Sequence, residues 1–279
     1  MNEMGAPKTY KLYVGGNFVR SESGRVYPVE SADGSTVRVA QASRKDLRDA
    51  VVKARGAQPG WAGSTAYLRG QILYRVAEML DGRRDQFVAE LENGGVDTYD
   101  AVSEVDDAVS AWIYWAGWTD KLAQVIGGVN PVAGPFLNVS TPEPTGVVGV
   151  IAPPSRPLAG LADLLAPVLC GGNTAVVLAS EPAPFAPLTF AEVLATADVP
   201  PGVANVLVGR TAELAPWLAD HHDVDAMEIS GVDDPALAVD LTVRSADNLK
   251  RVARTDGART PRTAGEFLEI KTVWHPARL

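Results

Sequence analysis

The sequence predicts an α/β protein built on a doubly wound parallel sheet. Residues 147–151 form an apolar, largely β-branched run between Gly146 and Pro153, which is typical of a strand buried on both faces. A second such run, residues 174–178, follows an apolar helical segment, so these pieces predict a βαβ unit. The turn at residues 153–157 is therefore expected at the carboxyl end of a parallel strand, where open α/β sheets bind their ligands.

Composition limits the partners that the chain is expected to have. With 279 residues, of which 46% are hydrophobic and 21% charged, it can bury one large core or two modest ones. The formal net charge of -9 repels phosphate backbones and anionic lipid, so neither nucleic acid nor a membrane is expected as a partner. We find no signal segment at the start and no run that approaches a membrane span, and we expect a cytoplasmic protein. One cysteine and three histidines predict neither a disulfide framework nor a metal site.

The first 123 residues predict a small hairpin followed by helices. Residues 11–20 alternate as a strand pair around a Gly-Gly-Asn turn, and residues 26–29 predict a further strand. A capping-box pattern at Ser43 starts a helix, which Pro59 and Gly60 are expected to stop. Three more helices are predicted at residues 66–80, 84–91 and 98–122. Trp112, Trp115 and Trp118 lie on the last of these and are assigned to the core or an interface rather than to a ligand site.

The second half continues the predicted alternation of strands and helices. Residues 124–141 predict a projecting β-hairpin, with residues 136–139 in its second limb. The predicted sheet domain then occupies residues 144–254, with helices at 187–197 and 212–219, strands at 205–208 and 225–229, and a final helix from about Asp233.

The last part of the chain predicts a linker and a strand. Residues 255–265 are polar, basic and rich in glycine and proline, which is typical of a flexible linker. Residues 266–274 predict an apolar strand that needs an edge to pair with, and another subunit is one possible source of that edge.

In this order, the pieces resemble the aldehyde dehydrogenase superfamily over nearly the whole chain. The segments that carry the resemblance are V-G-G-N-F-V-R-S-E-S-G at the start, A-R-G-A-Q-P-G-W-A, residues 146–157, G-N-T-A-V-V-L, P-P-G-V-A-N-V and the terminal L-E-I-K-T-V-W. The resemblance implies a Rossmann-like sheet that binds NAD(P), a catalytic domain inserted after it, and a hairpin plus terminal strand that build the oligomer. It divides this chain into residues 1–123, an oligomerisation hairpin at 124–143, the sheet domain at 144–254, a linker at 255–265 and an oligomerisation strand at 266–279.

The catalytic domain of that family is missing from the pattern. In the family, the catalytic domain lies between the sheet and the terminal strand and supplies a cysteine nucleophile and a glutamate base. In this chain only residues 255–265 occupy that place. Acyl transfer through a thiohemiacetal needs an accessible, activated thiolate. Cys170 ends an apolar helical run and is expected to be a buried core residue. No catalytic residue is therefore assigned.

The family's oxyanion turn is altered as well. Its asparagine amide stabilises the developing oxyanion, and Ser155 occupies that position here, so a preorganised donor is expected to be lost. Arg156 replaces an apolar ring and is either an anion contact or, as we favour, a solvated surface arginine.

The resemblance leaves the nucleotide site open. The family's lysine after the second sheet strand is absent, and Glu181 is either an acceptor for ribose hydroxyls or a solvated loop carboxylate. Asp233 and Asp234 start a helix where the family faces the pyrophosphate, so they oppose a diphosphate or simply cap the helix. Weak binding of NAD or NADP is expected. The candidate cofactor-binding residues are Pro153, Ser155, Ser180, Glu181, Gly209, Ser230 and Gly231.

Three acidic or histidine pairs are assigned structural roles. His221 and His222, followed by Asp223, are expected in a surface loop rather than at a metal, because no further ligand has a useful spacing. The acidic pairs Asp106–Asp107 and Asp233–Asp234 are assigned to helix surfaces or helix caps.

The leading functional hypothesis is a non-catalytic structural or regulatory subunit. It would assemble with itself or with a full-length catalytic aldehyde dehydrogenase through residues 124–141 and 266–274. The alternatives are an NAD(P)-dependent oxidoreductase that acts on aldehydes with a reduced active site, and a nucleotide-binding module.

Overall fold

The structure, a computed structural model, describes residues 8–277. Residues 1–7, which are part of the segment where we expected no signal sequence, and residues 278–279 of the predicted C-terminal segment lie outside the described residues. No helix within the described part of the chain is long and apolar enough to cross a bilayer.

The predicted doubly wound sheet forms the centre of the molecule. Its strand order is β11-β10-β7-β8-β9-β1-β2. The strands from β11 to β9 are parallel, and β1 and β2 continue the sheet in antiparallel fashion. Every residue of β7 and β8 is buried, as the two apolar runs predict. The bounds are β1 (Leu12–Val14), β2 (Asn17–Val19), β7 (Val147–Ile151), β8 (Thr174–Leu178), β9 (Ala204–Leu207), β10 (Ala226–Glu228) and β11 (Arg251–Ala253).

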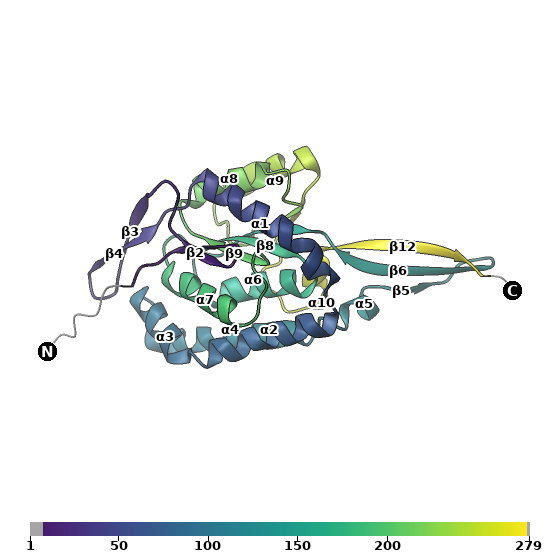
Figure 1. The fold of residues 1–279 in the computed structure, drawn as a ribbon, viewed down its shortest axis with the longest axis horizontal. Helices are drawn as coiled ribbons and strands as arrows, with labels where there is room; N and C mark the ends of the chain where they lie inside the picture. The colour runs from purple at the N-terminus through teal and green to yellow at the C-terminus, as the bar shows by residue number, and fades with distance from the viewer. Residues whose placement is uncertain (1–7, 278–279) are drawn as a thin grey trace.

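Helices cover both faces of this sheet (Figure 1). One face carries α1 (Arg44–Gly63), α8 (Thr211–Asp220) and α9 (Pro235–Ser245), and the other carries α6 (Ala159–Cys170) and α7 (Phe185–Thr196). An outer layer packs on α6 and α7, and consists of α2 (Ala66–Asp81), α3 (Arg84–Asn93) and α4 (Thr98–Ala116). Trp112 stacks on Phe190 with ring centroids 5.5 Å apart, and Trp115 is also fully buried, which confirms the assignment of these two tryptophans to the core. Trp118 lies beyond the end of α4 and is partly buried against the core.

The start of α1 follows the prediction and its end does not. Ser43 and Asp46 form the complete capping box, with the Ser43 hydroxyl accepting from the Asp46 N–H and the Asp46 carboxylate accepting from the Ser43 N–H. The prediction that Pro59 stops the helix is wrong, because α1 continues to Gly63. Interior proline costs a helix about 3 kcal/mol. The turn stays helical because Trp61 is buried and its indole N–H donates to the Leu169 carbonyl at 3.1 Å.

Several short elements have no counterpart in the sequence-based prediction. The strand β4 (Thr36–Ala40) pairs with β3 (Val26–Glu30) as a separate hairpin. The predicted helix at residues 98–122 is divided, because α4 ends at Ala116 and the short α5 (Leu122–Val125) follows a turn. A 3₁₀ turn, η1 (Ala246–Asn248), precedes β11.

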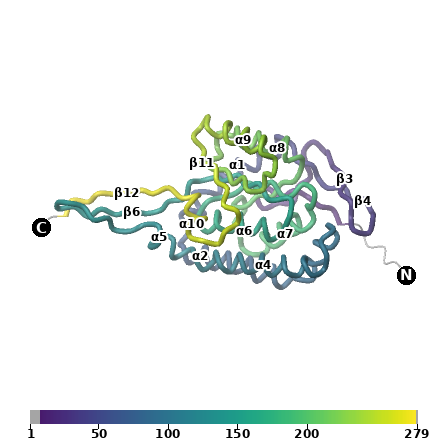
Figure 2. Tube along the Cα trace, turned by 180° about the vertical axis from the view of Figure 1, so that it is seen from behind, coloured from purple at the N-terminus to yellow at the C-terminus, as the bar shows by residue number. Residues whose placement is uncertain are grey.

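Residues 254–267, the connection between β11 and the terminal strand, are ordered rather than flexible. They contain α10 (Pro261–Gly265), which packs against α6 at the root of the C-terminal strand (Figure 2). The Arg259 guanidinium donates to the Asp163 carboxylate at 2.9 Å and to the Asp107 carbonyl at 2.8 Å. The composition alone predicts a flexible linker, because it does not reveal contacts with residues as distant in the sequence as Asp107 and Asp163.

The terminal strand finds its edge within the same chain. β12 (Leu268–Pro276) pairs with β6 (Phe136–Pro144) in antiparallel register along its whole length, and β5 (Gly128–Asn130) pairs with the other edge of β6. We call these three strands the arm. It extends well beyond the helical layers (Figures 1 and 2), and an edge supplied by another subunit is therefore not needed to pair β12.

Candidate functional site

A cleft of about 550 Å³ opens at the carboxyl edge of the parallel sheet. The turns that follow β7, β8, β9 and β10 line it, as expected for a ligand site of an open α/β sheet. The β3 strand and the start of α9 close it from outside. We call it the carboxyl-edge cleft.

Some of the predicted site residues line this cleft and others do not. Ser180, Glu181 and Gly231 line it. Four others belong to the same turns but do not line the cleft: Pro153, Ser155, Gly209 and Ser230. The sequence neighbours Pro154 and Arg210 line it instead. Sequence reasoning missed Tyr27, Arg210 and Leu237. Arg210 lies in the short turn between β9 and α8, so its position was a usable signal. Nothing in the sequence places Tyr27 of β3 across the cleft.

Glu181 is held by the chain itself. One carboxylate oxygen accepts from the Arg210 guanidinium at 2.6 Å, and the other accepts from the Thr211 backbone N–H at 2.8 Å, at the start of α8. Arg210 also lies over the Tyr27 ring, whose hydroxyl donates to the Glu181 carbonyl at 3.0 Å. Burial, and then the nearby Glu181 carboxylate, raise the pKa of Tyr27. A ribose hydroxyl would have to share Glu181 with both of these donors.

Ser180 and Gly231 shape the cleft through packing. The buried Ser180 hydroxyl donates to the Pro154 carbonyl and accepts from the Ala183 N–H, each at 3.2 Å, and so ties the turn after β8 to the turn after β7. A Cβ on Gly231 would collide with the carbonyl oxygens of Ile151 and Ala152. Only glycine allows this close approach of two backbones.

A buried carboxylate closes the base of the turn after β10. Glu228 accepts from the Ser230 N–H at 2.8 Å and from the Thr255 N–H at 3.3 Å, and it is fully buried. Burial raises the pKa of this carboxyl group. The backbone N–H of Ser230 therefore donates to Glu228 rather than pointing freely into the cleft.

The altered oxyanion turn after β7 is exposed and ion-paired. Ser155 is exposed, and Arg156 adopts a positive φ of 53°. The Arg156 guanidinium pairs with Asp107 at 2.6 Å. Asp107 is thus a partner of Arg156 as well as a residue of a helix surface. The arginine is half exposed, in keeping with the surface role favoured from the sequence.

The helix that follows this turn receives its cap from another helix. The Leu158 and Ala159 N–H groups at the start of α6 donate to the Glu104 carboxylate of α4 at 2.7 and 3.1 Å. Glu104 is buried, and burial raises its pKa. The helix α9 is capped by its own N-cap residue, Asp234, which accepts from the Ala236 N–H at 2.9 Å. With Glu181 on α8, three helix N-termini at the carboxyl edge already hold a carboxylate of the chain.

These caps decide how far a dinucleotide fits the cleft. Helix N-termini are the usual anion sites of such folds, because their free N–H groups and dipoles favour phosphate. Here one or two N–H groups at each of these N-termini already donate to Glu104, Glu181 or Asp234. The cleft itself is lined by four carboxylates and one cation, which are Glu30, Glu181, Asp233, Asp234 and Arg210. The position of the cleft at the carboxyl edge of the sheet is therefore suitable for NAD or NADP, but the negative charge of its lining repels their diphosphate.

Cys170 is buried, as the sequence predicts. Its side chain is fully inaccessible at the end of α6, and burial raises the pKa of the thiol to about 12. A thiol in this state supplies almost no thiolate at neutral pH, and no substrate can reach it.

The paired histidines lie at the end of α8. The ring Nδ1 of His221 accepts from the Asp223 N–H at 3.2 Å, and burial lowers the pKa of this imidazole. Among residues 8–277, no three histidine, cysteine, aspartate or glutamate side chains form a group that could hold a metal ion.

Comparison with known sequences agrees with the fold. A family model described as "Aldehyde dehydrogenase family" matches residues 18–263. The chain is 33% identical over 260 residues to "Aldehyde dehydrogenase, cytosolic 1" of Elephantulus edwardii, a match that covers 90% of this chain and 51% of the relative. It is 30% identical over 259 residues to the "Cytosolic 10-formyltetrahydrofolate dehydrogenase" of Mus musculus, covering 90% of this chain and 29% of the relative. The chain thus spans about half the length of the first of these curated relatives and less than a third of the second.

Solved structures give the same result. A putative aldehyde dehydrogenase from Burkholderia cenocepacia superposes with a TM-score of 0.82 at 29% identity, covering 88% of this chain and 50% of that one. PnpE in complex with nicotinamide adenine dinucleotide superposes with a TM-score of 0.81 at 30% identity, over the same shares of the two chains. Together with the sheet order and the carboxyl-edge cleft, these matches show that the chain belongs to the aldehyde dehydrogenase family.

Proposed function

We propose that this chain acts as a non-catalytic subunit that assembles, through its arm, with itself or with a full-length catalytic aldehyde dehydrogenase. The observation that carries the proposal is the direct passage from β11 to β12. In the place where the family inserts its catalytic domain, the chain has only residues 254–267, and Arg259 fixes this connection onto α6. The buried Cys170 offers no substitute nucleophile.

The surface of the arm supports the assembly part of the proposal. Val129, Ile270 and Trp274 are 69%, 50% and 56% exposed, and Phe136 packs against Trp274 beside them. Apolar groups gathered on a projecting element mark an interaction surface. The outer edge of β12 has no strand beside it within residues 8–277, so its backbone N–H and C=O groups suit pairing with a strand of a partner.

Co-expression tests this proposal directly. The chain is produced together with a full-length catalytic aldehyde dehydrogenase of the same cell, and light scattering on a sizing column measures the mass of each peak. We expect a homo-oligomer of this chain or a mixed species that contains both proteins. A strictly monomeric chain that elutes apart from the enzyme would contradict the proposal.

An activity assay separates this role from the alternative of a reduced oxidoreductase. The purified chain is incubated with NAD or NADP and a panel of short, branched and aromatic aldehydes, and NADH or NADPH formation is followed by absorbance. We expect no turnover. Turnover that disappears in Cys170→Ser would establish the oxidoreductase instead.

The carboxyl-edge cleft favours nucleotide binding as a second candidate function. Its position and its Tyr27 and Leu237 walls support contact with adenosine, and its carboxylates predict weak affinity. Asp233 is exposed, and Asp233→Asn removes one charge opposite the diphosphate. We expect calorimetry to show that NAD binds about threefold more tightly to this variant, because one repulsive charge near the surface is worth below about 1 kcal/mol.

The matched control for this measurement is Asp247→Asn, an exposed aspartate of η1 outside the cleft. It should leave the affinity for NAD unchanged. Equal gains in both variants would show a general charge effect and would argue against binding in the carboxyl-edge cleft.

A further inference from the structure

A second cleft, of about 850 Å³, lies between the first turns of α1 and the end of α8. We call it the α1–α8 cleft. It shares no lining residue with the carboxyl-edge cleft, and its charge is opposite. Four cationic side chains line it against two carboxylates: Arg25, Arg44, Lys45 and Arg48 face Glu22 and Asp220.

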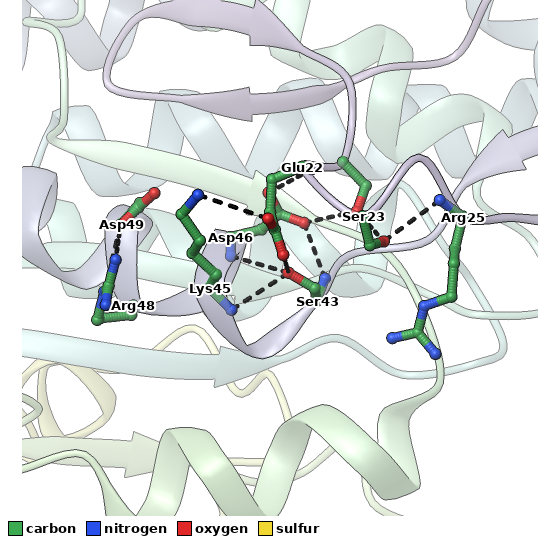
Figure 3. A network of polar contacts seen from close by, with 9 residues as sticks. Glu22, Ser23, Arg25, Ser43, Lys45, Asp46, Arg48 and Asp49 are labelled. Carbon is green, nitrogen blue, oxygen red and sulfur yellow. Dashed lines mark hydrogen bonds and ion pairs between the residues drawn. The ribbon is translucent and has the colours of Figure 1, made fainter.

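Most of these charges are paired, and two arginines are not. Glu22 pairs with Lys45 at 3.4 Å, and Asp220 pairs with Arg244 at 2.8 Å. Arg48 pairs with Asp49. Over residues 8–277, neither Arg25 nor Arg44 forms an ion pair. In Figure 3 the contacts join Glu22, Ser43, Lys45 and Asp46, and no contact reaches the Arg25 guanidinium.

The N-terminus of α1 is not what makes this cleft attractive to an anion. The capping box uses the Ser43 hydroxyl and the Asp46 carboxylate to satisfy the first N–H groups of the helix. The positive charge of the cleft therefore comes from side chains. Arg44 lies over the Trp217 ring, 5.9 Å from its centroid, and this stacking holds its guanidinium at the cleft wall.

The neighbouring surface adds to the same field. Arg25 also lines a further cleft of about 900 Å³, whose other arginines are Arg20 and Arg38. The two clefts share Arg25, and their cations stand against a net charge of -9 for the whole chain. Opposite charge concentrated in a hollow raises the local concentration of anions above that at the rest of the surface.

We propose that the α1–α8 cleft binds a small organic phosphate. The phosphate accepts from Arg25 and Arg44, because guanidinium groups match the geometry of phosphate oxygens with paired donors. The organic part lies against Trp217, the large apolar side chain of the wall. The site is independent of NAD binding and of the proposed assembly.

Calorimetry of the full chain with phenyl phosphate tests this site. We expect Arg25→Gln and Arg44→Gln each to weaken binding about tenfold, since each removes a charge-assisted hydrogen bond. Arg75→Gln is the matched control, because Arg75 is an exposed arginine paired with Asp198 elsewhere on the surface, and it should leave the affinity unchanged. Absence of binding to the unaltered chain, or an equal loss in Arg75→Gln, would overturn the proposal.

Calorimetry with inorganic phosphate distinguishes the contribution of the phosphate group from that of the organic part of the ligand. It should bind more weakly than phenyl phosphate, and Trp217→Leu should remove that difference. Arg25 is exposed, so we expect Arg25→Gln to fold normally. This variant therefore tests the phosphate contact even if Trp217→Leu fails to fold. Equal affinity for both probes in the unaltered chain would refute the contact with Trp217.

Discussion

At the scale of single residues, carboxylates of the chain fill the places where this fold usually receives a phosphate. Glu104, Glu181 and Asp234 accept from the first N–H groups of α6, α8 and α9. Each carboxylate gains from the helix dipole, which stabilises a nearby negative charge by about 0.3–1 kcal/mol. The same interactions that stabilise the helices therefore weaken the fit to a diphosphate.

Glu228 gives a residue-scale prediction about pH. Its buried carboxyl group has a pKa raised above its ordinary value of 4.5. The folded protein therefore binds a proton at Glu228 more tightly than the unfolded chain does. The contribution of this protonated carboxyl group to the free energy of unfolding falls as the pH rises from about 4.5 toward the raised pKa. Relative to Glu228→Gln, the unaltered chain should gain stability as the pH is lowered, by at most about 1.4 kcal/mol per unit of pH.

Urea unfolding of both proteins between neutral pH and the ordinary glutamate pKa measures this difference. Glu78→Gln is the control, because Glu78 is exposed on α2 and its removal should leave the pH dependence unchanged. A stability difference between the unaltered chain and Glu228→Gln that is independent of pH would refute the prediction.

The sequence identified some site residues and missed their partners for a physical reason. Ser180, Glu181 and Gly231 follow strand ends, so the periodicity of buried strands is enough to place them at the cleft. The contact of Glu181 with Arg210 joins residues that lie in different turns, and no local pattern encodes such a pair.

At the scale of elements, the buried strands were predictable and the short or irregular elements were not. The strands β7 and β8 have the predicted bounds because continuous apolar runs specify burial on both faces. β11 has three residues and no apolar run, so its pairing with β10 arises only from tertiary structure. The end of α1 was misplaced because the burial of Trp61 outweighs the local effect of Pro59.

The arm carries an element-scale prediction. Ile270→Glu and Trp274→Glu place charges on exposed apolar positions of β12, and a charge buried in an interface without a partner is costly. We expect each variant to shift the assembled species toward monomer on a sizing column, with little change in helical content by circular dichroism.

The control is Tyr99→Glu, which places the same charge at an 82% exposed apolar position of α4, away from the arm. It should leave the assembly intact. If the arm variants assemble as well as the unaltered chain, the interface lies elsewhere.

At the scale of the whole molecule, opposite charges are kept apart. The carboxyl-edge cleft collects carboxylates, and the α1–α8 cleft collects guanidinium groups. A net charge of -9 predicts that the chain as a whole repels anions. It does not predict the positive electrostatic potential of a single cleft. Composition therefore predicts bulk behaviour but not the ligands of individual clefts.

The connection of residues 254–267 also makes the fold modular. β11 ends in the central sheet, and at the other end of the connection the Phe267 carbonyl accepts from the Thr145 N–H next to β7. Both ends are thus pinned to the same body, close enough for a short loop to join them. The entropic cost of closing a loop grows only slowly with its length, so the length of the segment inserted between these two ends has little effect on the folding free energy of the sheet.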